Sequence, residues 1–338
     1  MVTARKTITA IVSGLVCAFL LSTLSANAAT NKKTVKLAYM GWDLGTAVTY
    51  VGKDAGLFEK YGLDLEEVFI SDGVTGAIRA LIGVDLVVGF GSPVTILQPI
   101  LEGSDIVFLG SHVRKEQYGL GVSSDIVTIK DLKGKKIGVS ALGRRSDLIV
   151  RVLLRRAGLD PLKDVNIVSA GFSPQRMVAL SNNLIQGAPL SPEVALQARK
   201  LGLKVLKVKE VPVVTSLVMT TRSFAAREHE AVRRFMKGYL NAIRYYLTHR
   251  KESVAIIKKY VTGVDSEALE AMYDTFAAQL TPVPGPNGEA VRSLIDVVSV
   301  ADLRAISLQP RDLFDLRFLE ELKTSGFIDQ LYSEKIGL

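Results

Sequence analysis

Short apolar runs that alternate with amphipathic stretches of about ten residues constrain the fold of this chain more than any other feature. Residues 35–40, 63–71, 85–90 and 106–111 have the composition of buried strands, and the segments between them have helical spacing. Strands separated by helices of this length favour a parallel sheet. The chain is therefore predicted to be an α/β protein.

The alternation restarts in the middle of the chain and predicts a second α/β unit. Strands are expected at residues 136–139, 165–170 and 204–209, with helices between them. Two further apolar stretches, 118–124 and 214–220, are predicted to cross between the units. Two sheets joined by two crossings form two lobes and a hinge, and ligand pockets favour such an interface.

Each lobe is expected to be a mainly parallel sheet flanked by helices. Lobe 1 is expected to combine residues 29–117 with residues 214–338, and lobe 2 to be the inserted segment 118–213. In lobe 1, residues 47–60 are predicted to form one helix that ends at Gly62. After the second crossing the chain is predicted to be nearly all helical. The helices expected there cover residues 228–248, 266–280, 289–300 and 311–324.

The N-terminus has the pattern of a targeting segment. Arg5 and Lys6 precede an apolar run at residues 8–24 and a small-residue pattern that ends at Ala28. This arrangement is typical of a secretory signal peptide, so residues 1–28 are predicted to be removed by cleavage after Ala28. An uncleaved membrane anchor is the alternative, although the run is short for a membrane span. The mature chain would have 310 residues and no cysteine, and therefore no disulfide or thiol chemistry.

The composition excludes several protein classes. A 48% share of hydrophobic residues is too high for a disordered chain, and a single Cys cannot build a disulfide scaffold. Only the N-terminus carries a long apolar run, which excludes a multi-span membrane protein. A length of 338 residues suggests about two domains.

Positive charge is concentrated in lobe 2. Residues 118–213 carry 16 Lys and Arg against 7 Asp and Glu, whereas the rest of the mature chain carries 24 against 27. Attraction of an anionic solute, or of an acidic or membrane-surface partner, is one explanation for this excess. Ordinary solvated helix faces are the other explanation.

Three arginines lie at predicted helix starts, where positive charge is disfavoured unless an anion is present. They are Arg144, Arg145 and Arg176. Helix N-termini bind anions through their free N–H groups, so these arginines are candidate contacts for an anionic ligand. Alternatively, Arg144 and Arg145 point into water or pair with Asp147 or Asp43.

No familiar catalytic pattern occurs in the sequence, because HExxH, CxxC, GxSxG and the Walker A pattern are all absent. His112 is predicted to follow a strand and to face the cleft, where it would either bond a ligand or be an ordinary loop histidine. Asp43 and Asp72 stand at strand ends and are candidates for acid–base work, although Asp in such loops more often caps a helix or turn. No metal and no cofactor are predicted.

Three motifs resemble one family. Residues 55–66 (AGLFEKYGLDLE) are similar to the first helix and second strand of the type II periplasmic solute-binding proteins. Residues 131–139 (DLKGKKIGV) resemble the segment that opens the second lobe in that family. Ser223 with residues 230–235 resembles the helix after its return crossing. The similarity covers roughly residues 35–250 and is strongest to the NMT1-like (SsuA/THI5-like) branch, which serves ABC importers of aliphatic sulfonates, nitrate, taurine and thiamine precursors.

The resemblance implies an exported, monomeric receptor that closes on a small anionic solute and delivers it to an ABC permease in the inner membrane. It implies no nucleic-acid partner. It also implies that loops after strands and helix N-termini hold the ligand. In lobe 1 the candidate positions, with His112 added from the reasoning above, are Trp42, Asp43, Thr46, Ser71, Asp72, Gly73, Ser92 and His112. In lobe 2 they are Ser140, Arg144, Arg145, Ser173, Arg176 and Ser191.

Several roles stay open among these residues. Trp42 would stack on a ring or an apolar tail of the ligand, or else pack between the lobes. The serines would donate to an oxyanion, or else cap helices. Relatives often carry a Gly-x-Asp-Ala pattern where this chain has Gly187, Ala188 and Pro189 without the acid, so the ligand is not named by analogy.

Two alternative functions remain on the same fold. One is an enzyme of the dehydratase or thiamine-pyrimidine-synthase type. The predicted export signal and the cysteine-free mature chain argue against the synthase, because that branch is cytosolic and uses a cysteine-rich motif. The other alternative is a periplasmic sensor that presents its ligand to a membrane kinase.

Overall fold

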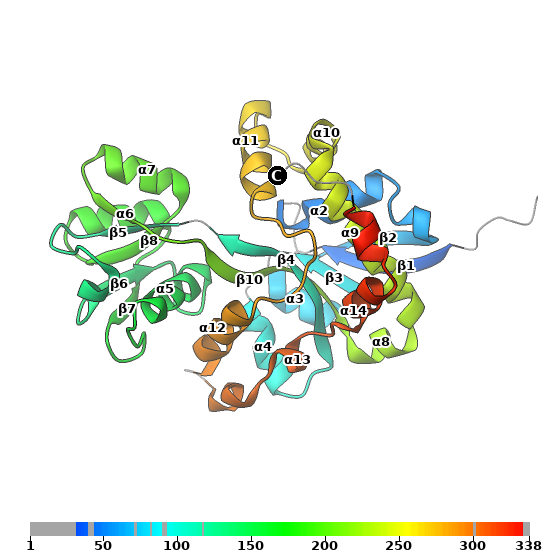
Figure 1. Cartoon of the computed structure of the whole chain (residues 1–338), viewed down its shortest axis with the longest axis horizontal. Coiled ribbons are helices and arrows are strands. Elements are labelled where there is room, and N and C mark those ends of the chain that lie inside the picture. The colour runs from blue at the N-terminus through cyan, green and yellow to red at the C-terminus, as the bar shows by residue number, and fades with distance from the viewer. Residues whose placement is uncertain are drawn as a thin grey trace, which may run out of the picture.

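The computed structural model describes residues 32–39, 44–70, 73–81, 83–89, 93–116, 118–299 and 302–333 (Figure 1). The predicted leader and its cleavage site lie outside this part of the chain. Within it, no helix has both the length and the apolar character needed to cross a membrane.

A five-stranded mixed sheet forms the centre of lobe 1, in the order β2-β1-β3-β10-β4. The parallel strands are β1 (Lys33–Tyr39), β2 (Leu63–Phe69) and β3 (Leu86–Gly89). Strand β10 (Val211–Thr221) runs antiparallel between β3 and β4 (Ile106–Glu116). The strands β1, β2 and β3 alternate with helices along the chain, which agrees with the predicted α/β class. The helices that follow β1, β2 and β3 are α2 (Leu44–Asp54), α3 (Gly73–Ala80) and α4 (Pro93–Leu101).

A second five-stranded sheet forms the centre of lobe 2, in the order β7-β6-β8-β5-β9. Strand β6 pairs in parallel with β7 and with the central strand β8, and β5 pairs antiparallel with β8 and β9. The strands are β5 (Gly119–Val122), β6 (Lys136–Val139), β7 (Asn166–Ser169), β8 (Gly187–Leu190) and β9 (Lys204–Lys207). The helices that follow β6, β7 and β8 are α5 (Arg145–Arg156), α6 (Ser173–Ser181) and α7 (Pro192–Lys200).

Two long strands connect the lobes. Strands β4 and β10 each have 11 residues and pair antiparallel, and Figure 1 shows them running side by side toward lobe 2. The register shifts between Pro212 and Thr215, which is a β-bulge near the lobe boundary. The stretch predicted at residues 214–220 is part of the connecting strand β10, but most of it pairs with β3 and β4 in the sheet of lobe 1, so the crossing itself lies nearer the start of β10. The crossing predicted at residues 118–124 is wrong, because β5 belongs to the second sheet and β4 itself extends across.

The helix predicted at residues 47–60 is divided in the structure. Helix α2 ends at Asp54, and the N–H groups of Gly56 and Leu57 donate to the carbonyls of Lys53 and Gly52. These two bonds form a Schellman motif, which needs the left-handed backbone that Gly56 supplies at φ 69°. A short 3₁₀ helix, η1 (Glu59–Tyr61), follows and ends at Gly62 as predicted.

The C-terminal third is helical, as predicted. It contains α8 (Arg222–Arg227), α9 (His229–Thr248), α10 (Arg250–Tyr260), α11 (Ser266–Ala277), α12 (Gly288–Ser299), a 3₁₀ helix η3 (Leu303–Ser307), α13 (Pro310–Leu313), α14 (Arg317–Thr324) and α15 (Phe327–Leu331). The single helix predicted at 311–324 is wrong. Between α13 and α14 the chain forms a parallel bridge from Phe314 to Phe108, and the N–H of Asp315 donates to the Phe108 carbonyl. Pairing with β4 therefore interrupts the helix.

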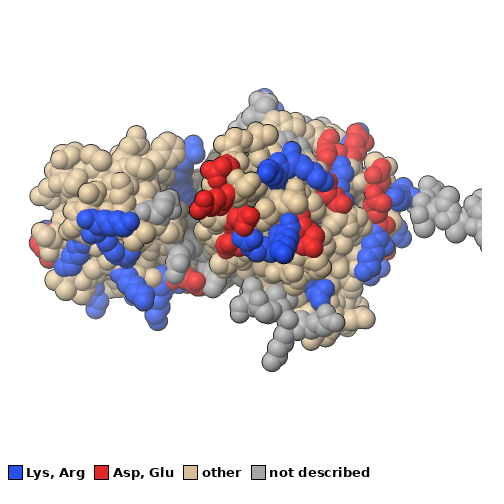
Figure 2. Space-filling view, turned by 90° about the horizontal axis from the view of Figure 1, so that it is seen from above, with Lys and Arg blue, Asp and Glu red and all other residues tan. Residues whose placement is uncertain are grey.

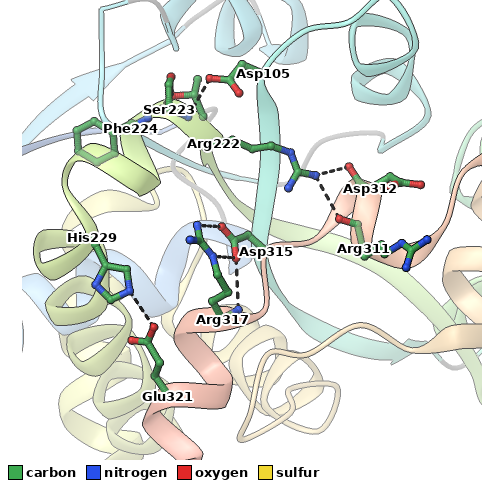
Figure 3. Close-up of polar contacts among 11 residues, drawn as sticks. Asp105, Arg222, Ser223, Phe224, His229, Arg311, Asp312, Asp315, Arg317 and Glu321 are labelled. Carbon is green, nitrogen blue, oxygen red and sulfur yellow. Dashed lines mark hydrogen bonds and ion pairs between the residues drawn. The ribbon is translucent and has the colours of Figure 1, made fainter.

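Polar contacts hold this C-terminal segment against lobe 1 (Figure 3). The Arg222 guanidinium donates to the carbonyl oxygen of Asp312 at 2.7 Å, at the end of α13. Within the segment itself, Arg317 pairs with the buried carboxylate of Asp315 at 2.6 Å. His229 on α9 contacts Glu321 on α14 at 2.8 Å. The last helices therefore belong to lobe 1 and complete its surface.

Helix α9 supplies much of the core of lobe 1. Phe235, Tyr239 and Leu240 are fully buried on its inner face, and the Phe235 ring stacks on Phe58 with centroids 5.2 Å apart. This face packs against α2, where Gly52 leaves room for close approach. Helices α2 and α9 therefore form a closely packed pair in the core of lobe 1.

Candidate functional site: a cavity between the lobes

A cavity of about 600 Å³ lies between the two lobes. Most of its lining comes from lobe 2, at the loops where β6, β7 and β8 lead into α5, α6 and α7. Lobe 1 contributes Pro93, the first residue of α4, and lobe-connecting strand β10 contributes Val213 to Thr215. The lining residues from lobe 2 are Tyr118, Ser140, Ala141, Arg144, Arg145, Ser146, Leu148, Gly171, Phe172, Ser173, Arg176 and Ser191.

Three helix N-termini meet at this cavity. Helices α5, α6 and α7 each begin at the carboxyl end of a parallel strand, so their first turns share one edge of the sheet. The positive ends of their dipoles and their unpaired N–H groups favour a negatively charged group there. Among the described residues that line the cavity, none carries a carboxylate.

Arg176 is a buried cation on the wall of the cavity. Its side chain is 3% exposed, its Nε donates to the Pro189 carbonyl at 3.0 Å, and its Nη1 donates to the Gly171 carbonyl at 2.6 Å. No Asp or Glu in the described ranges forms an ion pair with it. Burial lowers the pKa of Arg176, because the charged guanidinium loses its contact with water. A buried charge of this kind is stabilised by an opposite charge, and an anionic ligand would supply one.

Arg144 and Arg145 lie at the mouth of the cavity with exposed side chains. Arg144 is the N-cap residue of α5, and Arg145 is its first residue. The alternative that they pair with Asp147 is not what the structure shows, because Asp147 pairs with Arg151 at 2.8 Å and accepts the Gly143 N–H at 2.7 Å. Pairing with Asp43 concerns a residue outside the described ranges.

The serines at the cavity hold one another in place. The Ser140 N–H donates to Ser146 Oγ at 2.7 Å, and the two hydroxyls lie 2.8 Å apart. Ser173 Oγ accepts the Ser191 N–H at 2.9 Å, so its own hydrogen is available to a ligand. Ser191 is the N-cap residue of α7, but its side chain does not form the capping hydrogen bond. These hydrogen bonds fix the positions of the serine hydroxyls that line the cavity.

Apolar side chains form the rest of the wall. Phe172 is 77% exposed and precedes the first residue of α6, and Leu148 of α5 and Val213 and Val214 of β10 also line the cavity. Reasoning from the sequence missed these residues and Tyr118. The signal available for Phe172 was its place between a strand end and a Ser-Pro helix start.

The cavity brings together all six predicted positions in lobe 2. None of the predicted positions in lobe 1 is among the described residues that line the cavity. Thr46 is buried within α2, and Gly73 is the first residue of α3. The remaining ones, apart from His112, lie outside the described residues. These are Trp42, Asp43, Ser71, Asp72 and Ser92.

The predicted place of His112 is wrong. It lies within β4 and not after it, and its side chain is fully buried. Its Nδ1 is hydrogen-bonded to the Tyr239 hydroxyl, and its ring packs edge-on against Phe276. Burial lowers the pKa of His112 to about 3. The strand is longer than its apolar sequence run indicated, because it pairs with β10 as far as Glu116.

The described residues contain no group of three or more His, Cys, Asp or Glu side chains in an arrangement that could hold a metal ion.

The two sheets, the two connecting strands and the cavity between the lobes define the type II periplasmic-binding-protein fold. The putative sulfonate-binding protein SsuA from Methylobacillus flagellatus KT superposes with a TM-score of 0.63, at 17% identity over 88% of this chain and 96% of that chain. The aliphatic sulphonate binding protein SsuA from Escherichia coli gives 0.58, at 18% identity over 84% and 96%. The nitrate-binding protein NrtA from Synechocystis PCC 6803 gives 0.53, at 14% identity over 89% and 91%. The likeness to these structures establishes the fold.

The family follows from the sequence. The NMT1/THI5-like family model matches residues 45–253, and the chain belongs to this family, as the resemblance predicted. A putative binding protein from Brucella abortus (strain 2308) is 30% identical over 140 residues, which are 40% of this chain and 40% of that protein. A putative thiamine biosynthesis protein from Haemophilus influenzae is 31% identical over 144 residues, which are 42% of this chain and 43% of that protein. The chain thus matches less than half the length of these curated relatives.

Proposed function

We propose that this protein is the exported receptor of an ABC importer, which captures a small organic anion between its lobes by hinge closure. The observation that carries the proposal is Arg176, a cation that is 3% exposed and lies where three helix N-termini meet. No carboxylate of the described chain neutralises it. The family membership and the periplasmic-binding-protein fold support a binding role.

The cavity walls indicate the kind of anion. A volume of about 600 Å³ lies within the range of typical small-molecule sites. The wall contains arginines and serines as well as apolar residues. This combination suits a ligand with a negatively charged head group and an apolar body. We assign the head group to Ser140, Ser173 and Arg176, and the body to Phe172 and Val214.

The other elements of the proposal follow from the same fold. Lobe 1 is proposed to comprise residues 29–117 and 214–338, and lobe 2 residues 118–213. The two strands β4 and β10 form the hinge. The cleavage of residues 1–28, the periplasmic location, the monomeric state and the inner-membrane permease as partner belong to the proposal as well.

A ligand screen tests this function. The mature chain would be heated with sulfonates, nitrate, carboxylates, aromatic acids and thiamine pyrimidines, one at a time. A ligand at about 100 times its dissociation constant stabilises the fold by roughly 2.7 kcal/mol, so its melting temperature rises by several degrees. We expect an organic anion to be the strongest ligand.

Mass spectrometry of the recovered ligand separates a receptor from an enzyme. An unchanged ligand supports the receptor, whereas a consumed ligand assigns the protein to the enzymes built on this fold.

The double variant Arg144→Ala with Arg145→Ala is expected to weaken anion binding by about 1.5–3 kcal/mol for each charge-assisted bond lost. The matched control is Lys130→Ala with Lys136→Ala, which removes two exposed lobe 2 cations away from the cavity lining. Equal affinity of both variants and the wild type would overturn the role of the two arginines.

A further inference from the structure

One side of lobe 2 carries a group of basic residues that the ligand cavity does not use. The group comprises Arg199 and Lys200 at the end of α7, and Lys207 and Lys209 on or after β9. None of the four forms an ion pair with any residue that the structure describes. Figure 2, viewed from the side on which α7 lies in Figure 1, shows more Lys and Arg than Asp and Glu on this face of lobe 2. We call this group the α7–β9 face.

A hollow on the α7–β9 face places two of these cations together. It has a volume of about 240 Å³ and lies between α7 and the end of β9. Arg199 lines it from the helix and Lys207 from the strand, and the lining also includes the apolar residues Ala195 and Leu206. The lining contains no acidic side chain among the described residues. Two cations that line one hollow provide a place for one phosphate group.

Leucines stand next to these cations. Leu196 is 53% exposed and Leu201 is 65% exposed, although leucine is usually buried. Leu196 precedes Arg199 and Lys200 by three and four positions, so all three share one side of α7. Exposed leucines flanked by Lys and Arg are characteristic of helices that lie in a membrane interface.

We propose that the α7–β9 face binds the surface of a bilayer that contains anionic phospholipid. A lipid phosphate lies between Arg199 and Lys207, and the side chains of Leu196 and Leu201 enter the interfacial region. An acidic protein surface would engage the cations alone, whereas a bilayer interface accommodates both the cations and the two leucines. This membrane contact is independent of the ligand in the interlobe cavity, and it would bring a soluble receptor to the membrane that holds its permease.

Vesicle sedimentation tests the proposal on the full mature chain. The vesicles contain phosphatidylcholine alone or phosphatidylcholine mixed with phosphatidylglycerol. We expect the protein to sediment only with the vesicles that contain phosphatidylglycerol. The variant Arg199→Gln with Lys200→Gln and Lys207→Gln is expected to lose roughly fivefold in partition coefficient for each cation removed. The matched control, Lys251→Gln with Lys323→Gln and Arg311→Gln, removes three exposed cations of lobe 1 and should bind nearly as wild type.

A second variant separates a bilayer from an acidic protein. Leu196→Ser with Leu201→Ser keeps every charge, and the proposal expects it to partition several-fold more weakly onto the anionic vesicles. Wild-type partition of this variant would overturn the bilayer contact and leave the face to an acidic partner. An equal loss in the lobe 1 control variant would show that net charge alone drives the binding. Circular dichroism of each variant establishes that it is folded.

Discussion

Arg155 Nη2 on α5 lies 2.9 Å from Asp296 Oδ2 on α12, and this ion pair joins lobe 2 to lobe 1. The next residue, Arg156, forms a second bridge, because its Nε and Nη2 contact both carboxylate oxygens of Glu289 at 2.8 and 2.9 Å. The N-terminus of the same helix α5 stands at the ligand cavity. One helix therefore links the ligand site to the contact between the lobes.

Removing both bridges is expected to loosen the arrangement of the lobes and weaken ligand binding. All four side chains are about a third exposed, so each pair contributes about 0.2–1 kcal/mol. Arg155→Ala with Arg156→Ala should therefore lower the affinity by about 0.4–2 kcal/mol in total. Calorimetric titration with the strongest ligand of the screen measures this loss. Arg250→Ala is the control, because its partners Glu270 and Asp274 lie in the same lobe. An equal loss in both variants would contradict the interlobe role.

The buried pair of Asp147 and Arg151 is expected to matter for stability. Asp147 is fully buried, and it also accepts the Gly143 N–H in the loop that carries Arg144. Asp147→Asn leaves the Arg151 charge buried without compensation, which costs about 3–5 kcal/mol. Urea denaturation measures the free energy of unfolding. The exposed pair of Lys163 and Asp160 is the comparison, and Lys163→Ala should change stability by less than about 1 kcal/mol. Similar small effects of both substitutions would refute the prediction.

His112 is expected to make the folded state sensitive to acid. Its pKa is lowered to about 3 by burial, whereas in the unfolded chain it is about 6.5. Between these values the unfolded chain binds a proton that the folded chain does not bind. Stability contributed by neutral His112 is therefore complete above about pH 6.5 and is lost as the pH falls toward about 3. The loss should reach about 2 kcal/mol at pH 5.

A comparison of variants isolates this contribution from that of the carboxylates. His112→Gln should show a flatter dependence of the unfolding free energy on pH between about 6.5 and 5 than the wild type. His249→Gln, at an exposed histidine, should retain the wild-type slope. If the unfolding free energy of the His112 variant and of the wild type depended on pH in the same way, the folded protein would not exclude the proton that His112 binds in the unfolded chain.

The lobe 2 side of the cavity was predicted partly from local rules, which indicate the arginines at helix starts, and partly from the family resemblance, which implied the serines. Strand ends and helix starts are local in sequence, and the parallel pairing of β6 with β7 and β8 then places Ser140, Arg176 and Ser191 at one edge of a sheet. Arg176 stood out because a cation at a helix start is unfavourable without an anion. Its burial was not predictable, because it depends on contacts with Pro189 and Gly171 across the loop.

The errors have long-range causes. Residues 311–324 have helical spacing, but pairing of Phe314 with Phe108 interrupts the helix, and the two residues are far apart in the sequence. His112 was placed after a strand because the apolar run ends at Ser111, whereas pairing with β10 extends β4 to Glu116. Tyr118 was missed because an aromatic residue in a loop carries no local sign of facing a cavity, whereas for Phe172 the nearby strand end and helix start were the available signal.

Phe172 is expected to contribute to affinity only for ligands with an apolar body. Its ring is 77% exposed in the cavity wall and would be covered by such a ligand. Phe172→Ala should weaken binding of an aromatic or alkyl sulfonate by about 1.5–3 kcal/mol and leave any binding of nitrate unchanged. Leu184→Ala, at a leucine of lobe 2 that is 64% exposed and lies outside the cavity lining, is the control. An unchanged sulfonate affinity would place the apolar body elsewhere.

The central claim is that a negative charge on the ligand neutralises the buried guanidinium of Arg176. The most direct measurement uses the wild-type protein and two matched ligands, the strongest carboxylate of the screen and its primary amide, in calorimetric titrations at one ionic strength. The amide preserves shape and removes the charge. The claim predicts that the carboxylate binds more tightly by about 1.5–3 kcal/mol, which is about one to two orders of magnitude in Kd. Equal affinity for the two ligands, or tighter binding of the amide, would contradict it.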